Sequence, residues 1–202
     1  AATQHSQSLY ALFTQIPGLK VVVPSNAYDA KGLLIQAIRD DDPVIFFENK
    51  VQYDDLDEVP DEAYTIPFGE ARFTREGKDI TIVAVGRMVK FANQAADALL
   101  KEGIECTVID PRTTSPLDED SIIESIEETG HLVVVDEGTP RCGFAADIGA
   151  LVAEKAFYAL KSPVKYVTAP HTPVPFAPAL ESLYIPSAEK IIASVKQALH
   201  IS

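Results

Sequence analysis

Residues 80–85 read Ile-Thr-Ile-Val-Ala-Val, a short run that is apolar at every position except Thr81. A run of this length and composition is typical of a β-strand that is buried on both faces. Similar short runs recur along the chain, at residues 19–23, 44–47, 104–109, 132–135 and 164–168. Longer stretches with helical periodicity separate them. This alternation predicts an α/β fold in which helices cover a parallel sheet.

Three of the separating stretches carry helix signals. Residues 26–39 place apolar side chains at helical spacing, and residues 91–101 repeat the pattern before Gly103 ends it. In the third stretch, Ser115 is followed by Pro116 and then by acidic residues. This order predicts a helix with the serine as its N-cap and the proline at its first position.

The segment at residues 52–78 interrupts the alternation. Six acidic side chains and one proline crowd positions 54–62, and no apolar periodicity survives there. A solvated connector is the favoured interpretation, ahead of a cation-binding loop. The connector divides the chain into residues 1–51, which are too few for a complete α/β domain, and residues 79–202, which suffice for one.

The composition bounds the possible functions. Of the 202 residues, 47% are hydrophobic and 23% are charged, as in an ordinary globular protein. The net charge of −13 disfavours binding to nucleic acid or to an anionic membrane surface. Cys106 and Cys142 form no CxxC pair, so we expect buried, reduced thiols in a cytoplasmic protein. The chain does not begin with Met, so we expect a fragment of a longer protein.

Two histidines are candidate functional residues. His5 lies between Gln4 and Gln7 in an expected loop, and either amide could fix one tautomer of its ring. An ordinary surface loop is the alternative. His171 lies in a rigid, proline-rich loop that could serve function or packing equally well.

A candidate cation site lies where the first predicted helix ends. The free carbonyls and carboxylates at this helix end are ligands that hard cations prefer. The run concerned is Ala-Ile-Arg-Asp-Asp-Asp-Pro (37–43). A solvated acidic turn is the alternative.

Several short motifs, taken in order, resemble one known family. They are Gln-His-Ser-Gln-Ser (4–8), Pro-Gly-Leu-Lys-Val-Val (17–22), Asp-Ala-Lys-Gly-Leu-Leu (29–34), Ala-Ile-Arg-Asp (37–40), Ile-Asp-Pro-Arg-Thr (109–113) and Val-Pro-Phe (174–176). The chain resembles the beta subunit of the thiamine diphosphate-dependent component of 2-oxo acid dehydrogenase complexes, of the acetoin or pyruvate dehydrogenase type. The resemblance covers essentially all of the chain.

The resemblance implies a fold and an active-site residue. Residues 1–51 would form the second half of a pyrimidine-binding α/β domain, and residues 79–202 a transketolase-type C-terminal domain. His5 matches the histidine that lies near the cofactor and the channel of the lipoyl arm. In relatives, the missing upstream half carries the glutamate that activates thiamine diphosphate, and the alpha subunit binds the diphosphate with Mg²⁺.

The resemblance also assigns an ion, a substrate and partners. The positions at which relatives hold potassium match Ala37, Ile38, Asp40 and Asp42, although some ligands would come from the missing half. Residues 170–178 are similar to acetoin-cleaving relatives, so acetoin is favoured over pyruvate. The implied partners are an alpha subunit, a second beta chain and a lipoyl-bearing acyltransferase core. As a fragment, the chain could instead be a non-catalytic module for dimerisation and docking.

One helix is expected to form the contact between two beta chains. In residues 143–160 the charges are confined to Asp147, Glu154 and Lys155, so the predicted helix is apolar over most of its surface. One sheet face cannot cover that much apolar surface. We therefore expect a homodimer through this helix, or a heterotetramer with two alpha chains in the parent protein.

Overall fold

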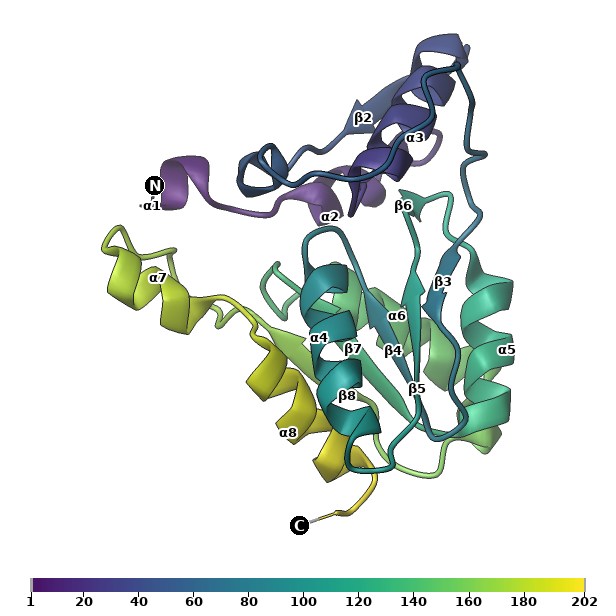
Figure 1. Cartoon of the computed structure of the whole chain (residues 1–202), viewed down its shortest axis with the longest axis vertical. Coiled ribbons are helices and arrows are strands. Elements are labelled where there is room, and N and C mark those ends of the chain that lie inside the picture. The colour runs from purple at the N-terminus through teal and green to yellow at the C-terminus, as the bar shows by residue number, and fades with distance from the viewer. Residues whose placement is uncertain (1, 202) are drawn as a thin grey trace.

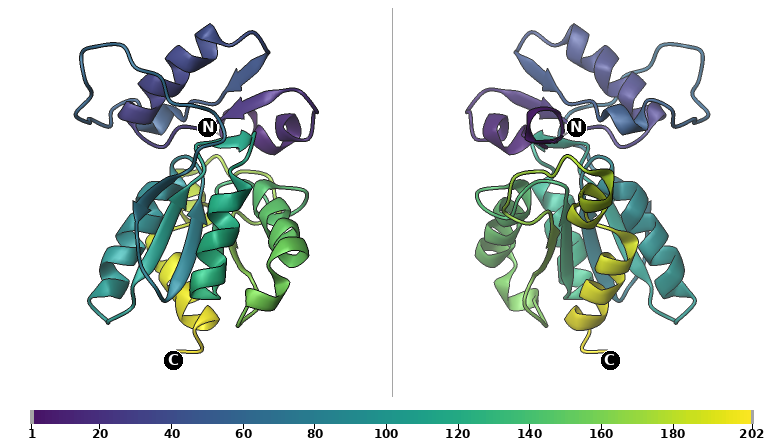
Figure 2. Two further views of the ribbon diagram at one scale, coloured as in Figure 1. Left: turned by 90° about the vertical axis from the view of Figure 1, so that its right-hand side faces the viewer. Right: turned by 90° about the vertical axis from the view of Figure 1, so that its left-hand side faces the viewer.

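The computed structural model describes residues 2–201, and its strands form two separate sheets (Figure 1). The larger sheet has five strands in the order β3-β5-β4-β7-β8, and the smaller has three in the order β2-β1-β6. Both side views show the smaller sheet with its helices as a distinct unit above the larger one (Figure 2). The two units meet at the carboxyl ends of the parallel strands of the larger sheet.

The larger sheet confirms the predicted architecture. Its parallel strands are β4 (Ile80–Ala84), β5 (Cys106–Asp110), β7 (Leu132–Asp136) and β8 (Lys165–Thr168). Every residue of β4, β5 and β7 is buried, as their largely apolar runs predict. The fifth strand, β3 (Arg72–Arg75), pairs antiparallel with β5 at the sheet edge.

Helices cover both faces of the larger sheet. α4 (Met88–Leu100) and α8 (Ala188–Ala198) pack on one face and bury a cluster that includes Met88, Leu99 and Ile191. α5 (Glu119–Thr129) and α6 (Phe144–Lys155) pack on the other face. This three-layer arrangement is the expected solution for a parallel sheet.

The smaller sheet is built around β1 (Lys20–Val22). β1 pairs in parallel with β2 (Val44–Phe46) and antiparallel with β6 (Thr113–Ser115). α3 (Ala27–Arg39) covers one face, where Leu33 packs with Val22 and Ile66. The remaining elements are α1 (Ala2–His5), α2 (Tyr10–Thr14), η1 (Lys50–Gln52), η2 (Phe157–Ala159) and α7 (Pro178–Tyr184).

The sequence patterns did not predict two of the strands. β3 reads Arg-Phe-Thr-Arg and lies inside the segment interpreted as a connector, and β6 has only three residues, Thr-Thr-Ser. Neither strand is uniformly apolar. β6 is held by its pairing with β1, a partner that is remote in sequence. The acidic run at positions 54–62 forms no helix or strand, as the connector interpretation predicts.

The predicted start of the third helix is wrong. Ser115 is the last residue of β6, and its hydroxyl donates to the carbonyl of Leu19 (3.0 Å) instead of capping a helix. α5 begins later, and its N-cap is Asp118, whose carboxylate accepts from the backbone N–H of Ser121 (3.1 Å). Pairing with β1 therefore determines where this helix can begin.

Only one of the two cysteines is buried as the sequence predicted. Cys106 is buried in β5, but Cys142 is exposed, because it lies in the loop before α6. The prediction that both thiols are buried is therefore wrong. Between residues 2 and 201, no helix is both long enough and apolar enough to cross a membrane.

Candidate functional site

His5 is the last residue of α1, at the N-terminal end of the smaller unit. The sequence predicted a loop at this position, whereas the structure shows a single helical turn. The imidazole is exposed and makes no hydrogen bond to any other described residue. The neighbouring Gln7 amide donates to the carbonyl of Thr3 (2.7 Å) and so does not fix the ring.

Two contacts connect residues 2–10, the His5 segment, to the larger unit. The hydroxyl of Thr3 donates to the carbonyl of Val174 at 3.5 Å, which is a long hydrogen bond. The hydroxyl of Tyr10 donates to Asp136, at the carboxyl end of β7, and both side chains are buried. The same carboxylate also accepts from the N–H groups of Gly138 (2.6 Å) and Ala145 (3.4 Å), at the start of α6. Burial raises the pKa of Asp136, and its hydrogen bonds oppose that shift.

A pocket of about 360 Å³ lies between the His5 segment and the larger sheet. Its lining comes from four segments: residues 3–9 on either side of His5, the loop after β7, the loop after β8, and α7. The lining residues are Thr3, Ser6, Gln7, Ser8, Leu9, Glu137, Gly138, Thr139, His171, Thr172, Pro173, Val174 and Tyr184. Ligands of α/β proteins commonly bind at the carboxyl ends of parallel strands, and this pocket lies at the carboxyl ends of β7 and β8. His171, the second candidate of the sequence analysis, therefore lines the same pocket as the residues that follow His5.

Glu137 is the acidic residue of this pocket. Its carboxylate accepts from the Asn49 amide (3.1 Å) and lies 3.5 Å from the Arg87 guanidinium. Burial raises the pKa of Glu137, and the nearby Arg87 opposes the shift. A partly buried carboxylate in a pocket is a recognised mark of a functional site. The sequence analysis missed Glu137, although its position directly after a buried strand was a usable signal.

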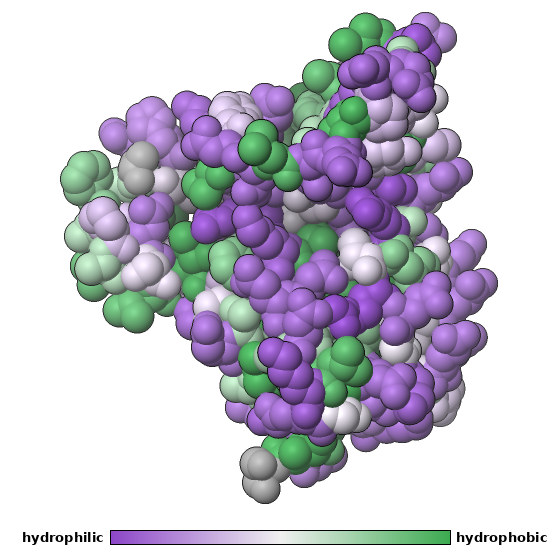
Figure 3. Space-filling view, in the orientation of Figure 1, coloured by the Kyte–Doolittle hydropathy of each residue, from purple (hydrophilic) through white to green (hydrophobic). Residues whose placement is uncertain are grey.

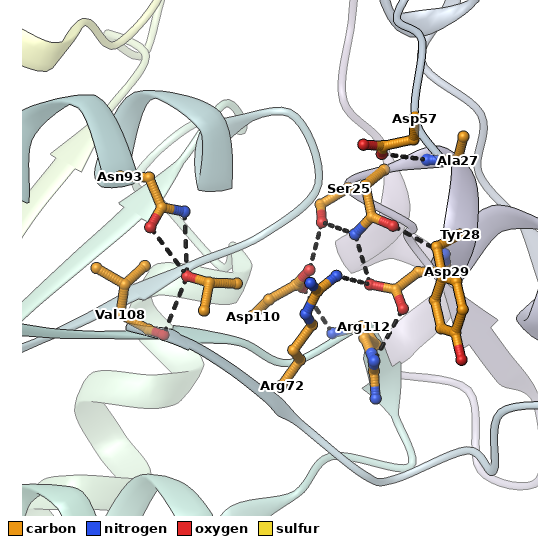
Figure 4. Close-up of polar contacts among 12 residues, drawn as sticks. Ser25, Ala27, Tyr28, Asp29, Asp57, Arg72, Asn93, Val108, Asp110 and Arg112 are labelled. Carbon is orange, nitrogen blue, oxygen red and sulfur yellow. Dashed lines mark hydrogen bonds and ion pairs between the residues drawn. The ribbon is translucent and has the colours of Figure 1, made fainter. Parts of the chain in front are cut away.

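A second polar cluster joins the two units away from this pocket (Figure 4). Asp29 of α3 is fully buried and pairs with Arg72 of β3 (3.5 Å) and with Arg112 (2.8 Å), which lies between β5 and β6. Asp110, at the end of β5, accepts from the hydroxyl of Ser25 (2.5 Å). Burial raises the pKa of Asp110 to about 7, against the hydrogen bonds from Ser25 and from the backbone N–H of Arg112. These contacts fix the orientation of the smaller unit on the larger one.

The predicted cation ligands lie together at the C-terminal end of α3. Lys20 is already within reach of both carboxylates, because its ammonium lies 2.7 Å from Asp40 and 3.0 Å from Asp42. Hydrogen bonding to Lys20 lowers the pKa of Asp40. The carbonyl of Ala37 accepts from the N–H of Asp40 (3.4 Å), while Ile38 is exposed. Potassium would compete with Lys20 for these carboxylates, so the residues present do not fit the ion without further ligands.

No group of three or more His, Cys, Asp and Glu side chains in residues 2–201 could hold a metal ion. The assignment of Ala37, Ile38, Asp40 and Asp42 to a potassium site stays a prediction.

Comparison with known proteins matches the chain to two domain families. Residues 69–191 match the family model of the transketolase C-terminal domain, and residues 1–55 match that of the transketolase pyrimidine-binding domain. A solved structure titled "Split gene transketolase, inactive beta4 tetramer" is similar over 95% of this chain and 61% of that chain. The TM-score of that match is 0.77, at 27% sequence identity.

The chain is also similar to curated subunits of two dehydrogenases. It is 57% identical to the beta subunit of acetoin:2,6-dichlorophenolindophenol oxidoreductase from Bacillus subtilis, and 60% identical to that from Cupriavidus necator. It is 46% identical to the beta subunit of the pyruvate dehydrogenase E1 component from Rickettsia felis. These matches cover 98 to 100% of the chain but only 58 to 62% of each relative. Because the C-terminal model alone matches more than half of the residues, the chain belongs to the transketolase C-terminal domain family, with part of a transketolase pyrimidine-binding domain preceding it.

Proposed function

We propose that the chain is part of the beta subunit of a thiamine diphosphate-dependent, acyl-transferring dehydrogenase that cleaves acetoin. The observation that carries this proposal is the difference in identity, 57 to 60% to acetoin-type beta subunits against 46% to a pyruvate-type subunit. Decarboxylation of pyruvate is the second candidate. In both cases the acyl group would pass to a lipoyl domain.

His5 would serve the acyl transfer as a proton donor. Thiamine diphosphate, when bound, supplies the carbanion chemistry that cleaves a bond next to a carbonyl. An imidazole can deliver the proton that the departing sulfur of a lipoyl disulfide requires. His5 is exposed and free of hydrogen bonds to other described residues, so its ring is accessible to such a group. The Tyr10–Asp136 contact would hold this segment in place.

The partners of the proposed subunit are an alpha chain, a second beta chain and a lipoyl-bearing acyltransferase core. The exposed side of α6 supports a contact between beta chains. Ala150 and Ala153 of that helix are exposed, and Phe157 and Tyr158 continue the exposed apolar surface beyond it.

A cytoplasmic location is consistent with two unpaired cysteines. The division into residues 1–51, 52–78 and 79–202 also belongs to this proposal.

Calorimetric titration of thiamine diphosphate with Mg²⁺ tests the proposal. We expect no binding to the 202-residue chain alone, and stoichiometric binding when the complete beta subunit is combined with its alpha subunit. The alternative function, a non-catalytic module for dimerisation and docking, concerns the 202-residue chain itself and predicts that this chain binds no cofactor even when the alpha subunit is added. Turnover of acetoin with an artificial electron acceptor then separates acetoin cleavage from pyruvate decarboxylation.

A further inference from the structure

The pocket beside the His5 segment has an unusual charge distribution. Among its lining residues, Glu137 is the one carboxylate, and none is Lys or Arg. Arg87, the N-cap residue of α4, approaches Glu137 but does not line the pocket. An anionic ligand would therefore meet a carboxylate and no lining cation to pair with, in a chain of net charge −13.

The pocket nevertheless offers several free hydrogen-bonding groups. The hydroxyls of Ser6, Ser8 and Thr139 and the imidazole of His171 make no hydrogen bonds to other described residues, although they line one cavity. Leu9, Pro173 and Val174 add apolar surface. A volume of about 360 Å³ lies at the small end of the range for ligand pockets.

We propose that this pocket binds a small uncharged hydroxyketone, and that Glu137 is the residue that disfavours anionic 2-oxo acids there. The lack of a cationic lining residue accounts for the preference for an uncharged ligand. The hydroxyls and the imidazole can bond to the hydroxyl and carbonyl groups of such a ligand, and the apolar surface can contact its methyl groups. The choice of a hydroxyketone rests on the proposed function, whereas the exclusion of anions rests on the pocket alone.

Amide chemical-shift titration of the ¹⁵N-labelled chain tests this proposal, with acetoin and pyruvate as separate probes. Acetoin should shift the amides of Ser6, Ser8, Gly138 and Thr172, and pyruvate should bind at least tenfold more weakly. Glu137→Gln should reduce that difference to less than threefold. Glu154→Gln, on the exposed side of α6, serves as the matched control and should leave the difference unchanged.

Equal affinity for the two probes, or shifts confined to another surface, would overturn the proposal. Should Glu137→Gln fail to fold, Ser8→Ala provides the second test, because its hydroxyl supports no described contact. That variant should weaken acetoin binding several-fold. Turnover by the assembled enzyme is measured separately. If acetoin binds at this pocket but is not cleaved, the proposed function is wrong and this inference stands. If acetoin is cleaved but does not bind here, this inference is wrong and the proposed function stands.

Discussion

Asp110 is a buried carboxyl group that remains protonated in the folded protein at unusually high pH. Its pKa is raised by burial from 3.8 to about 7, so the folded state holds the proton more tightly than the unfolded state does. The stability from this group is therefore fully present below pH 4 and is lost as the pH rises toward 7. Asp29 and Arg112 lie in the same cluster, so the effect falls on the contact between the two units.

Asp110→Asn should remove this pH dependence, because the amide resembles the protonated acid. At pH 8 the variant should be more stable than the wild type, by on the order of 2 kcal/mol, and the difference should vanish near pH 4. Urea unfolding at the two pH values measures it. Asp41→Asn, at an exposed position, is the control. A constant difference between Asp110→Asn and wild type from pH 4 to pH 8 would show that Asp110 does not titrate in this range.

His5→Ala should affect one chemical step and not the fold. In the complete alpha-beta enzyme, we expect lipoyl acylation to slow by about 10² to 10⁴, the usual contribution of one positioned acid or base. Thiamine diphosphate affinity should change by no more than a few-fold, and turnover with an artificial acceptor should fall less, because that route bypasses the disulfide. His200→Ala, near the C-terminal end of the chain, is the control. Wild-type acylation by the His5 variant would exclude the proposed role.

The sequence pointed to His5 only through its neighbouring motif, since nothing in its local spacing distinguishes an active-site imidazole from a surface one. Glu137 and His171 share a pocket because two parallel strands end side by side, which requires knowledge of the strand order. Asp29 and Asp110 were not candidates at all. Their partners lie 83 and 85 residues away in sequence, and no local pattern encodes such a pairing.

At the level of elements, α2 is attached to the larger unit by apolar packing and by one buried side-chain hydrogen bond. Tyr10 lies at the start of this five-residue helix and donates to Asp136. Burial and the neighbouring Asp136 raise the pKa of Tyr10 well above its usual value, so the phenol remains a donor throughout the physiological range. The ring also packs edge-on against Phe47 at 5.9 Å.

Tyr10→Phe should keep the ring packing and remove only the hydrogen bond. The expected loss is about 1 to 3 kcal/mol of unfolding free energy, because Asp136 would be left buried with one donor fewer. Tyr28→Phe is the matched control, since the side chain of Tyr28 is exposed and its hydroxyl makes no hydrogen bond to another described residue. Thermal and urea unfolding of both variants measure the difference. Equal stability of the two variants would mean that the hydrogen bond contributes nothing.

The strands and helices that the sequence predicted correctly are those with strong local patterns. Uniform burial makes β4, β5 and β7 largely apolar, so each is visible in the sequence. β3 lies at an edge, with two of its four residues exposed, and needs no such pattern. Ser115 carries a genuine capping signal, but it pairs with β1 instead, because tertiary contacts override a local preference that is worth about 1 kcal/mol.

At the level of the whole molecule, exposed apolar residues are spread over the surface, and two places where they lie together bear on assembly. Phe176, Leu180 and Leu183 are exposed on and before α7, and Figure 3 shows green surface where that helix lies in Figure 1. The second place is the end of α6, with Phe157 and Tyr158. Exposed apolar surface of this kind is a usual mark of a subunit contact.

The proposed homodimer assigns the second place to a beta–beta contact. Light scattering at micromolar concentration should give twice the mass of one chain, and Tyr158→Asp should shift the population toward monomer by at least tenfold in dissociation constant. Tyr53→Asp, at an exposed tyrosine of the connector region, should leave the mass unchanged. A monomeric wild type would exclude the dimer.

β6 belongs by sequence to the second half of the chain and by pairing to the sheet of the first half. A protease that cuts the exposed loop at Leu56, a residue 96% exposed, would therefore cleave the chain without separating the pieces. The nicked protein should run as two bands on a denaturing gel and as one peak on a sizing column. Co-expression of the two pieces from separate genes should likewise yield an assembled protein, so an evolutionary split of the gene at this point would cost the fold little.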